Sequence, residues 1–400
     1  MKDNWKKMPI GEVCKSYAGG TPSRSNPTYY GAEIPWISSG EVNQAYITDT
    51  KEKITKKGLR FSSAKMIPKE AILLAMYGAT AGQVSKLKID ATANQAVLAL
   101  IPDDADDYYI YHELNFIKNH ILFLAQGSGQ PNLSKSLIDQ TLIDLPPLPQ
   151  QRKIANILST CDDVIEKTEA AIAKYQALKQ GVMHDLFTRG IDIKTGKLRP
   201  SYQDAPELYK ESELGMIPKD WEVKKLEDFL ILKSGDGITS KDINDFGEYP
   251  VYGGNGLRGY TNAYTHEGDY VLIGRQGALC GNITLSNGKI YASEHAVVVT
   301  ITDKSDVKWI EYKLRLMNLN QYSEASAQPG LSVGKIVKLA IKVPQGNEQQ
   351  LIGKRFNSIE SRIKTELGVV AKYQQLKTGL MQDLLTGKVE VKVAEEILKN

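Results

Sequence analysis

A phrase of sixteen residues occurs twice in this 400-residue chain, and its spacing constrains the whole fold. Residues 173–188 read AKYQALKQGVMHDLFT and residues 371–386 read AKYQQLKTGLMQDLLT, with eleven of the sixteen positions identical. The copies start 198 residues apart, and the same offset relates Gln151 to Gln349. A chain that keeps such an offset carries an internal duplication, so we expect two related halves rather than one large core.

Both copies of the duplicated segment have the apolar spacing of a long coiled-coil helix, in which intervals of four and three residues alternate. The seam positions are Ile154, Leu158, Cys161, Ile165, Thr168, Ile172 and Tyr175 in the first copy, and Ile352, Phe356, Ile359, Ile363, Glu366, Val370 and Tyr373 in the second. The pattern predicts that the seams continue through Leu178, Val182 and Leu186, and through Leu376, Leu380 and Leu384. Thr168 and Glu366 place a polar group at the same seam position, where it could fix the register.

The length of these helices favours packing between them. Each would be roughly 50 Å long at 1.5 Å per residue, which exceeds what a small domain needs. The alternative is that each amphipathic helix lies on its own domain. Two matching seams in one chain are more simply explained if the helices pack on each other.

The middles of the two halves differ from each other and read as strands and turns. Short apolar runs such as AILLAMYGAT, QAVLALI, DYVLIGR and HAVVVTI are bounded by Gly, Pro, Asn or Ser. Each middle also has one predicted helix before its end, with its apolar face in the first half at Ile110, Leu114, Ile117, Ile121 and Leu124. We therefore expect an α+β protein with two globular domains joined by a coiled coil.

The predicted boundaries follow from the repeat and from the prolines that precede each helix. The first globule is 18 residues longer than the second, measured from Trp5 to Gln130 and from Trp221 to Gln328. The predicted segments are residues 1–147, 148–188 (first helix), 189–220 (linker), 221–343, 344–388 (second helix) and 389–400 (tail).

The charge distribution and the cysteine content give weak indications of the partner and of the cellular compartment. The net charge is only +3, yet residues 1–90 carry 14 Lys and Arg against 8 Asp and Glu, a net of +6. This asymmetry suits a protein that presents one face to an anion, although a solvated charge run is an equally good explanation. The three cysteines fit no metal or disulfide spacing, and no secretory signal or membrane span is evident. We expect a cytoplasmic protein with reduced thiols.

Catalytic motifs are absent or incomplete in the sequence. Gly254, Gly256 and Gly259 have the spacing of a dinucleotide-binding loop, but strand and turn residues follow where that motif needs a helix. Residues 26–29 (Asn-Pro-Thr-Tyr) approach the Asn-Pro-Pro-Tyr motif of adenine methyltransferases, with threonine in place of the second proline. The five histidines show no metal-ligand spacing. The sequence predicts neither an active site nor a metal site.

Polar, glycine-rich loops between the predicted strands are the candidate binding residues. Arginine can read guanine, and asparagine or glutamine can read adenine, by paired hydrogen bonds in the major groove, while hydroxyls contact phosphates. Taken singly, each loop could be an ordinary turn. The DNA-binding candidates are Thr21, Ser23, Arg24, Tyr77, Thr80, Gln130 and Asn132 in the first half, and Asn255, Arg258, Tyr260, Arg275, Gln276, His295 and Gln328 in the second.

The ordered set of these phrases resembles the specificity subunit of type I restriction–modification systems. The resemblance rests on GGTPSRSNPTYYGAEIPWISSGEV, LPPLPQQRKIANIL, IPKDWEVKKL, YPVYGGNGLRGYT, VLIGRQGALCG and the repeated KYQ.LK.G.M.DL, and it runs from Trp5 to Lys388. The second helix is preceded by VPQGNEQQ and lacks the proline run of the first.

The resemblance implies a function that the motifs alone do not. It implies two target-recognition domains, each reading one half of a split DNA sequence, with antiparallel helices that set the gap and dock methyltransferase subunits. Restriction/translocase subunits would join that assembly. S-adenosylmethionine, ATP and Mg would be cofactors of the partners, and this chain would bind double-stranded DNA without catalysis or a membrane. Two alternatives remain, a nucleotide-binding enzyme that uses the Gly254–Gly259 loop and a coiled-coil adaptor that does not bind DNA.

Overall fold

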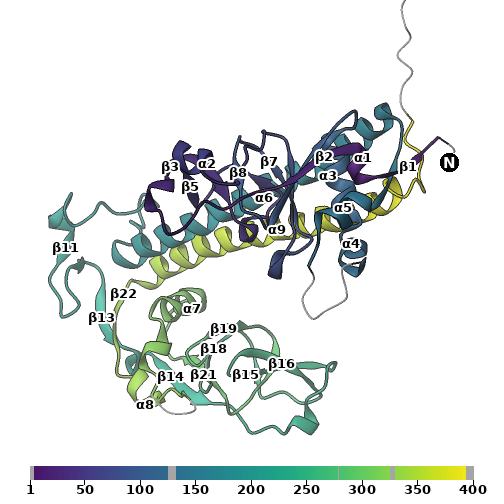
Figure 1. Ribbon diagram of the computed structural model, residues 1–400. Helices are drawn as coiled ribbons and strands as arrows, with labels where there is room; N and C mark the ends of the chain where they lie inside the picture. Colours follow the sequence, from purple (N-terminus) through teal and green to yellow (C-terminus); the bar gives the residue numbers. More distant parts are fainter. Residues whose placement is uncertain (1–3, 125–131, 278, 325–328, 393–400) are drawn as a thin grey trace, which may run out of the picture. The chain divides into compact units, whose positions relative to one another are not determined.

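The computed structural model describes residues 4–124, 132–277, 279–324 and 329–392, and they form two compact units (Figure 1). The first unit comprises residues 1–170 together with 366–400, and the second comprises residues 171–365. Each unit therefore contains one globular domain and parts of both long helices. No helix among the described residues is both long and apolar enough to cross a membrane.

The first unit is built on a five-stranded sheet in the order β2-β9-β6-β7-β4. Its strands are β2 (Cys14–Ala18), β9 (Val97–Pro102), β6 (Ile72–Ala75), β7 (Val84–Leu87) and β4 (Tyr46–Ile47). β6 and the first four residues of β9 are buried throughout, which explains their unbroken apolar sequences. A smaller sheet, β5-β3-β8, is formed by β5 (Glu52–Ile54), β3 (Tyr30–Ile37) and β8 (Thr92–Ala93).

Short elements close the first unit around its core. β1 (Lys6–Pro9) pairs with β10 (Leu142–Leu145), and the short helices are α1 (Ile10–Val13), α2 (Lys56–Arg60), α3 (Asp107–Phe116), α4 (Lys118–Leu124) and α5 (Lys135–Gln140). The single helix expected through Leu124 is thus two helices, because Ile117 leaves the helical conformation at φ −85° and ψ 4°. Leu124 is exposed rather than part of the apolar face.

The second unit repeats the same sheet frame with different additions. Its main sheet has the order β14-β21-β18-β19, with β14 (Leu230–Ser234), β21 (Ala296–Ile301), β18 (Tyr270–Gly274) and β19 (Ile283–Ser286). This order matches β2-β9-β6-β7 of the first unit. The second sheet contains β16 (Gly256–Thr261), β15 (Tyr249–Gly253), β20 (Lys289–Ala292) and β17 (His266–Glu267). Two strand pairs are separate from these sheets, β13 (Glu222–Lys225) with β22 (Ala340–Val343) and β11 (Tyr209–Lys210) with β12 (Ile217–Pro218). The short helices are α7 (Val307–Leu316) and α8 (Val333–Ile336).

Matching hydrogen bonds link each globular domain to its long helix. The Gln151 side chain accepts from the Asp106 backbone N–H at 2.9 Å and donates to the Pro146 carbonyl at 2.7 Å. Gln349 makes the same two bonds, with Asp306 and Pro344, each at 2.9 Å. Asp106 and Asp306 are in turn the N-caps of α3 and α7. The duplicated glutamines therefore fasten the start of each long helix to the corresponding short helix.

The long helices α6 (Leu148–Thr188) and α9 (Gly346–Leu384) pack on each other in opposite directions. In the first unit the start of α6, with Ile154 and Leu158, shares a buried core with Leu384 near the end of α9. In the second unit the end of α6, with Phe187, shares a core with Ile352 and Phe356 from the start of α9. The fold is thus the expected α+β arrangement with an antiparallel helix pair and an internal repeat.

Salt bridges at equivalent positions accompany this packing. Lys377 pairs with Asp162 at 2.5 Å in the first unit, and Lys179 pairs with Glu360 at 2.5 Å in the second. Each residue lies 198 positions from its counterpart. The repeat therefore extends from the sequence to individual ion pairs.

The predicted seam residues differ in burial along the helices. Fully buried or nearly buried positions are Ile154, Leu158, Cys161, Ile172, Ile352, Phe356 and Val370. Partly exposed positions are Ile165, Tyr175, Ile363 and Tyr373. Leu178 and Leu376, where the seams were expected to continue, are 49% and 48% exposed. The Thr168 hydroxyl donates to the Val164 carbonyl of its own helix, so it does not reach across the seam.

The segment between the first helix and the second domain is anchored by one buried carboxylate. Glu348 of α9 has no exposed side-chain surface and accepts hydrogen bonds from Arg199 at 2.9 Å and from the Trp221 indole at 3.0 Å. It also accepts from the Ile191 backbone N–H at 2.7 Å. The predicted linker therefore includes a packed polar core rather than only surface loop.

Candidate nucleic-acid interface

The candidate loops of the first unit meet at one edge of its main sheet. β2 and β6 both run antiparallel to β9, so their carboxyl ends and the beginning of β9 lie at the same edge. Two backbone bonds tie these ends together, from Gly19 N–H to the Val97 carbonyl at 3.0 Å and from Met76 N–H to the Ala96 carbonyl at 2.8 Å. The topology thus brings together loops that are far apart in the sequence.

Thr21, Ser23 and Arg24 lie in the loop that leaves β2. The Thr21 hydroxyl donates to the Gln95 side chain, which belongs to the turn before β9. Ser23 is exposed and its hydroxyl lies 2.7 Å from that of Ser25. These hydroxyl groups therefore lie in the loops at this edge of the sheet and are not buried in the core.

Arg24 is fixed by an ion pair and by aromatic rings. Its guanidinium donates to the two carboxylate oxygens of Glu52 at 2.6 and 3.1 Å, and it lies 4.4 Å from the centre of the Tyr30 ring. The hydrogen bond from Arg24 lowers the pKa of the Glu52 carboxyl. An arginine has five N–H donors in a planar fork, so some remain for another acceptor. Arg24 is thus pre-oriented, and a nucleic-acid contact would compete with Glu52.

Tyr77, Thr80 and Asn132 lie close together at the same edge. Tyr77 is 40% exposed and precedes the short turn Gly78–Thr80, whose Thr80 hydroxyl donates to the Ser39 carbonyl at 3.0 Å. The Leu133 N–H donates to the Met76 carbonyl at 3.0 Å, which places exposed Asn132 beside the end of β6. Gln130 lies outside the described residues.

The glycine-rich segment of the second unit is a β-hairpin. β15 and β16 are joined across Gly253 and Gly256 by the two residues Gly254 and Asn255. Gly256 and Gly259 lie within strand β16 and no helix follows directly. The dinucleotide-binding interpretation is therefore wrong, because that motif places the pyrophosphate at a helix N-terminus. At Gly259 a Cβ would lie 2.7 Å from the Asn244 carbonyl, which explains glycine at this position.

The hairpin displays three candidate side chains. Asn255 lies at its tip and is exposed, as is Arg258 on β16. Tyr260 is partly exposed and its backbone exchanges two hydrogen bonds with Asn244, at 2.8 and 2.9 Å. The hairpin is therefore braced by the loop that carries Asn244.

Arg275, Gln276 and His295 come together at the edge of the second main sheet. The Arg275 N–H donates to the His295 carbonyl at 2.9 Å, and its side chain donates to the Ser234 hydroxyl at 3.1 Å. Gln276 is exposed and forms a backbone bridge with Gly330. The His295 ring lies 3.2 Å from Glu294. These loops occupy the edge equivalent to the one described for the first unit, and Gln328 lies outside the described residues.

Two residues outside the predicted set lie beside the candidate residues, Phe246 in a loop and Glu52 in strand β5. Phe246 is 87% exposed, which makes it the most exposed of the large apolar side chains described, and it lies two residues from Asn244. Its signal in the sequence is an isolated aromatic among the turn formers of INDFGEYP. Glu52, the partner of Arg24, has no such signal, because the contact joins residues 28 positions apart.

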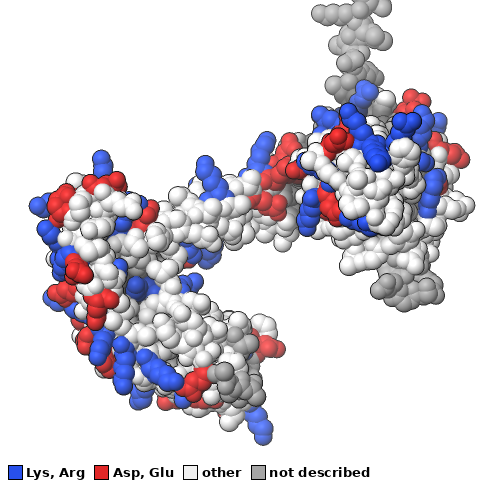
Figure 2. Space-filling model, turned by 60° about the vertical axis from the view of Figure 1, so that its left-hand side comes forward, with Lys and Arg blue, Asp and Glu red and all other residues white. Residues whose placement is uncertain are grey.

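Charge and reactive groups give no second kind of site in the described parts of the chain. Figure 2 shows basic and acidic side chains interspersed on its face rather than separated by sign. No group of three or more His, Cys, Asp or Glu among the described residues could hold a metal ion. The cysteines are free and buried, and burial raises the pKa of Cys14 to about 12.

Sequence comparisons group this chain with one family. The profile described as "Type I restriction modification DNA specificity domain" matches residues 2–174 and 218–373. The type I restriction enzyme EcoprrI specificity subunit of Escherichia coli is 30% identical over 358 residues, covering 86% of this chain and 84% of that protein. The MjaVIII specificity subunit of Methanocaldococcus jannaschii is 25% identical over 420 residues, covering 98% and 94%.

Solved structures have the same fold. The S subunit of a type I restriction–modification system from M. genitalium aligns with a TM-score of 0.69 at 17% identity, over 95% of this chain and 96% of that one. A chain from a structural study of complex assembly and conformational transition of the type I R-M system aligns with a TM-score of 0.50 at 15% identity, over 97% and 99%.

Proposed function

Because this chain belongs to the specificity subunits of type I restriction–modification systems, the non-catalytic components of those enzymes, we propose that it reads a bipartite, asymmetric DNA target. Residues 1–147 would read one half-site and residues 221–343 the other. Residues 148–188 and 344–388 would form the spacer, with 189–220 as linker and 389–400 as tail.

The observation that carries this proposal is the repeated sheet frame with different loops at the same edge. Each frame gathers exposed side chains that can donate and accept hydrogen bonds with base edges and phosphates. The first frame offers the Arg24 loop and the second offers the Arg258 hairpin. Because the loops differ while the frames agree, the two domains would recognise different base sequences.

The antiparallel helix pair supports a fixed distance between the half-sites. Equivalent ion pairs, Lys377 with Asp162 and Lys179 with Glu360, accompany matching buried contacts in the two units. A coiled coil of set length would act as a ruler for the DNA gap, since one helical turn of B-DNA is about 34–36 Å. The same repeat would offer related surfaces to two methyltransferase subunits.

Partner subunits would supply the chemistry in this proposal. Methyltransferase subunits would dock on the helices and bring S-adenosylmethionine, and restriction/translocase subunits would bring ATP and Mg. The chain studied in relation to complex assembly of the type I R-M system has the same fold, which is consistent with such an assembly.

Selection from a randomised duplex DNA library tests the proposal directly. The chain would be used with the methyltransferase subunit encoded beside it, and bound DNA would be sequenced. We expect a split motif with one fixed gap. A single continuous motif, or no enrichment by a folded complex, would reject bipartite recognition and favour a coiled-coil adaptor.

A further inference from the structure

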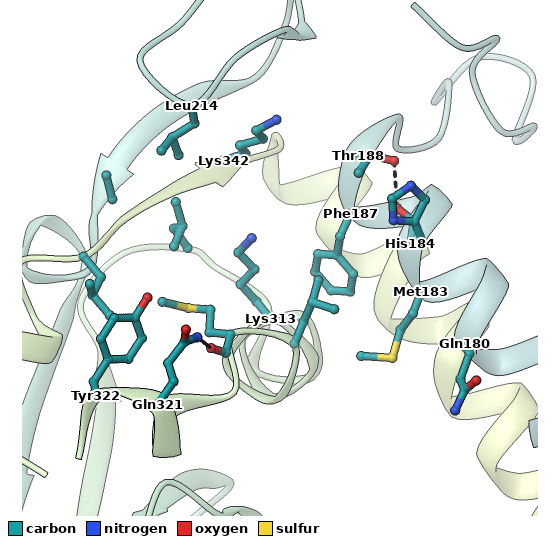
Figure 3. Close-up of a pocket in the computed structure, with 15 residues that line it drawn as sticks. Gln180, Met183, His184, Phe187, Thr188, Leu214, Lys313, Gln321, Tyr322 and Lys342 are labelled. Carbon is teal, nitrogen blue, oxygen red and sulfur yellow. Dashed lines mark hydrogen bonds between the residues drawn. The ribbon is translucent and has the colours of Figure 1, made fainter. Parts of the chain in front are cut away.

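The second unit has an open, partly apolar cavity that contains two lysines, and the proposed reading of DNA does not explain it. It has a volume of about 680 Å³ and lies between the end of α6, α7 and the paired strand β22 (Figure 3). Its apolar lining includes Met183 and Phe187 of α6 and Leu316 of α7. Tyr322 lies on the opposite side of the cavity from Phe187 in Figure 3.

Two lysines carry the charge of this cavity. Lys313 of α7 and Lys342 of β22 are among the described residues that line it, and none of these is an aspartate or glutamate. The Lys342 ammonium donates to the Met216 carbonyl at 3.2 Å. The Lys313 ammonium lies 5.7 Å from the centre of the Phe187 ring, a cation–π contact.

The two ammonium groups carry the same charge and repel each other. Burial, and then the nearby charge of Lys342, lower the pKa of Lys313 to about 8. Burial likewise lowers the pKa of Lys342. An anion between them would offset both the repulsion and the loss of hydration, because opposite charges within about 4–6 Å favour the charged form.

The internal repeat indicates that the charge is specific to this half of the chain. Counted from the N-caps Asp106 and Asp306, the counterpart of Lys313 is Glu113. At the 198-residue offset the counterpart of Lys342 is Asp144, which lies in β10, the strand equivalent to β22. Both lysines are thus replaced by acids in the first unit, although the helix contacts around them are repeated.

We propose that this cavity binds a carboxylate carried on an apolar segment of a partner subunit, and that it does so once per chain. The two ammonium groups receive the carboxylate, and Met183, Phe187 and Leu316 receive the apolar part. Glu113 and Asp144, at the equivalent positions of the first unit, carry the opposite charge and do not offer a carboxylate this pair of cations. The cavity therefore distinguishes the two halves of a chain that otherwise repeats itself. This inference rests on the proposed assembly with partner subunits, and not on the DNA sequence that is read.

Lysine acetylation followed by mass spectrometry tests occupancy of the cavity. The whole chain would be labelled alone and then assembled with its methyltransferase subunits, or with both kinds of partner subunit. We expect Lys313 to react about tenfold more slowly in one of the assemblies, while exposed Lys338 reacts equally in all of them. Equal reactivity of Lys313 in the free chain and in every assembly would overturn the proposal.

Charge variants separate an ionic role from simple burial. K313Q/K342Q should weaken assembly by about tenfold or more, K313R/K342R should retain it, and K338Q serves as the matched control. Native mass spectrometry, which reports subunit stoichiometry, should show that the glutamine variant loses one partner copy per chain. Unchanged assembly of the folded glutamine variant would reject the proposal. At saturating partner concentrations the library selection should return the same half-sites for this variant, so a loss of half-site recognition would count against the proposed function and not against this inference.

Discussion

At the scale of single residues, an ion pair within the chain decides whether a predicted DNA contact is available. Arg24 is bound by Glu52 and lies over Tyr30, so it is both ordered and partly occupied. Both members of the pair are about half exposed, and solvent therefore screens their attraction. A phosphate or a guanine edge could replace Glu52 at little cost.

Arg24→Ala should weaken binding of the selected DNA by about 1–3 kcal/mol and relax the preference at one base pair of one half-site. Fluorescence anisotropy with single-base variants of the target would measure both effects. Arg60→Ala is a suitable control, because Arg60 is also exposed and lies over the ring of Phe61. An equal loss for every DNA sequence would instead assign Arg24 to a phosphate.

His112 makes the first unit sensitive to acid. Its ring is fully buried, with one nitrogen 3.1 Å from the Ser159 hydroxyl and the other 3.9 Å from Asp162. Burial, followed by the charges of Lys377 and Lys86, lowers the pKa of His112 to about 3. Between about pH 6.5 and pH 3 the unfolded chain therefore binds a proton at this histidine that the folded chain does not bind.

This histidine should cost the fold up to about 1.4 kcal/mol of stability for each pH unit below about 6.5. Urea unfolding of the first unit at pH 7 and pH 5 would measure the loss. In the His112→Gln variant this contribution to the pH dependence of the unfolding free energy should disappear, although the variant is less stable at pH 7. A slope that is the same in both proteins would assign the acid sensitivity to other groups.

At the scale of elements, the two equivalent ion pairs of the long helices differ in burial. Asp162 is 8% exposed and Lys377 is 17% exposed, whereas Lys179 and Glu360 are 26% and 30% exposed. Burial raises the pKa of Asp162 even with Lys377 beside it, so this carboxylate depends on its partner. Glu360 also accepts a hydrogen bond from the Tyr312 hydroxyl at 2.6 Å.

Lys377→Met should therefore destabilise the protein by about 3 kcal/mol, because a buried carboxylate loses its counter-ion. Lys179→Met is the matched variant, and it should cost no more than about 1 kcal/mol, as expected for a more exposed pair. The free energies of unfolding in urea would be compared. Equal losses in the two variants would contradict the role assigned to burial.

The helix pair also predicts how the DNA target should respond to its length. Removing one heptad between Ile154 and Tyr175, with seven facing residues of α9, shortens the spacer by about 10 Å. We expect a gap shorter by about three base pairs, with both half-sites retained. Repeating the library selection would measure this. A changed half-site with an unchanged gap would reject the ruler.

At the scale of the whole molecule, two recognition frames on one chain predict independent half-sites. Arg24 and Arg258 lie in different domains and share no partner among the described contacts, so we consider the variants Arg24→Ala and Arg258→Ala. Their losses of DNA-binding free energy should therefore add to within about 0.5 kcal/mol in the double variant. Anisotropy titrations of the four proteins give this cycle. A coupling well above that value would mean that the two frames do not read separate sites.

Much of the architecture was predictable from local patterns. The 198-residue repeat and the heptad spacing predicted two long helices, and the short apolar runs, such as the one that contains ILLA, predicted strands. These features depend on the spacing of apolar side chains within a few turns, which the sequence displays directly. The break at Ile117 and the exposure of Leu178 and Leu376 were not predictable in this way, since they depend on what each helix packs against.

The sequence by itself determined the duplication, the types of element and the family to which the chain belongs. Only the tertiary structure decided which loops meet at one sheet edge, that Arg24 binds Glu52, and that Lys313 and Lys342 line one cavity. The physical reason is that such contacts join residues far apart in the chain. Strand order and helix direction bring them together, and apolar spacing along the sequence does not encode either.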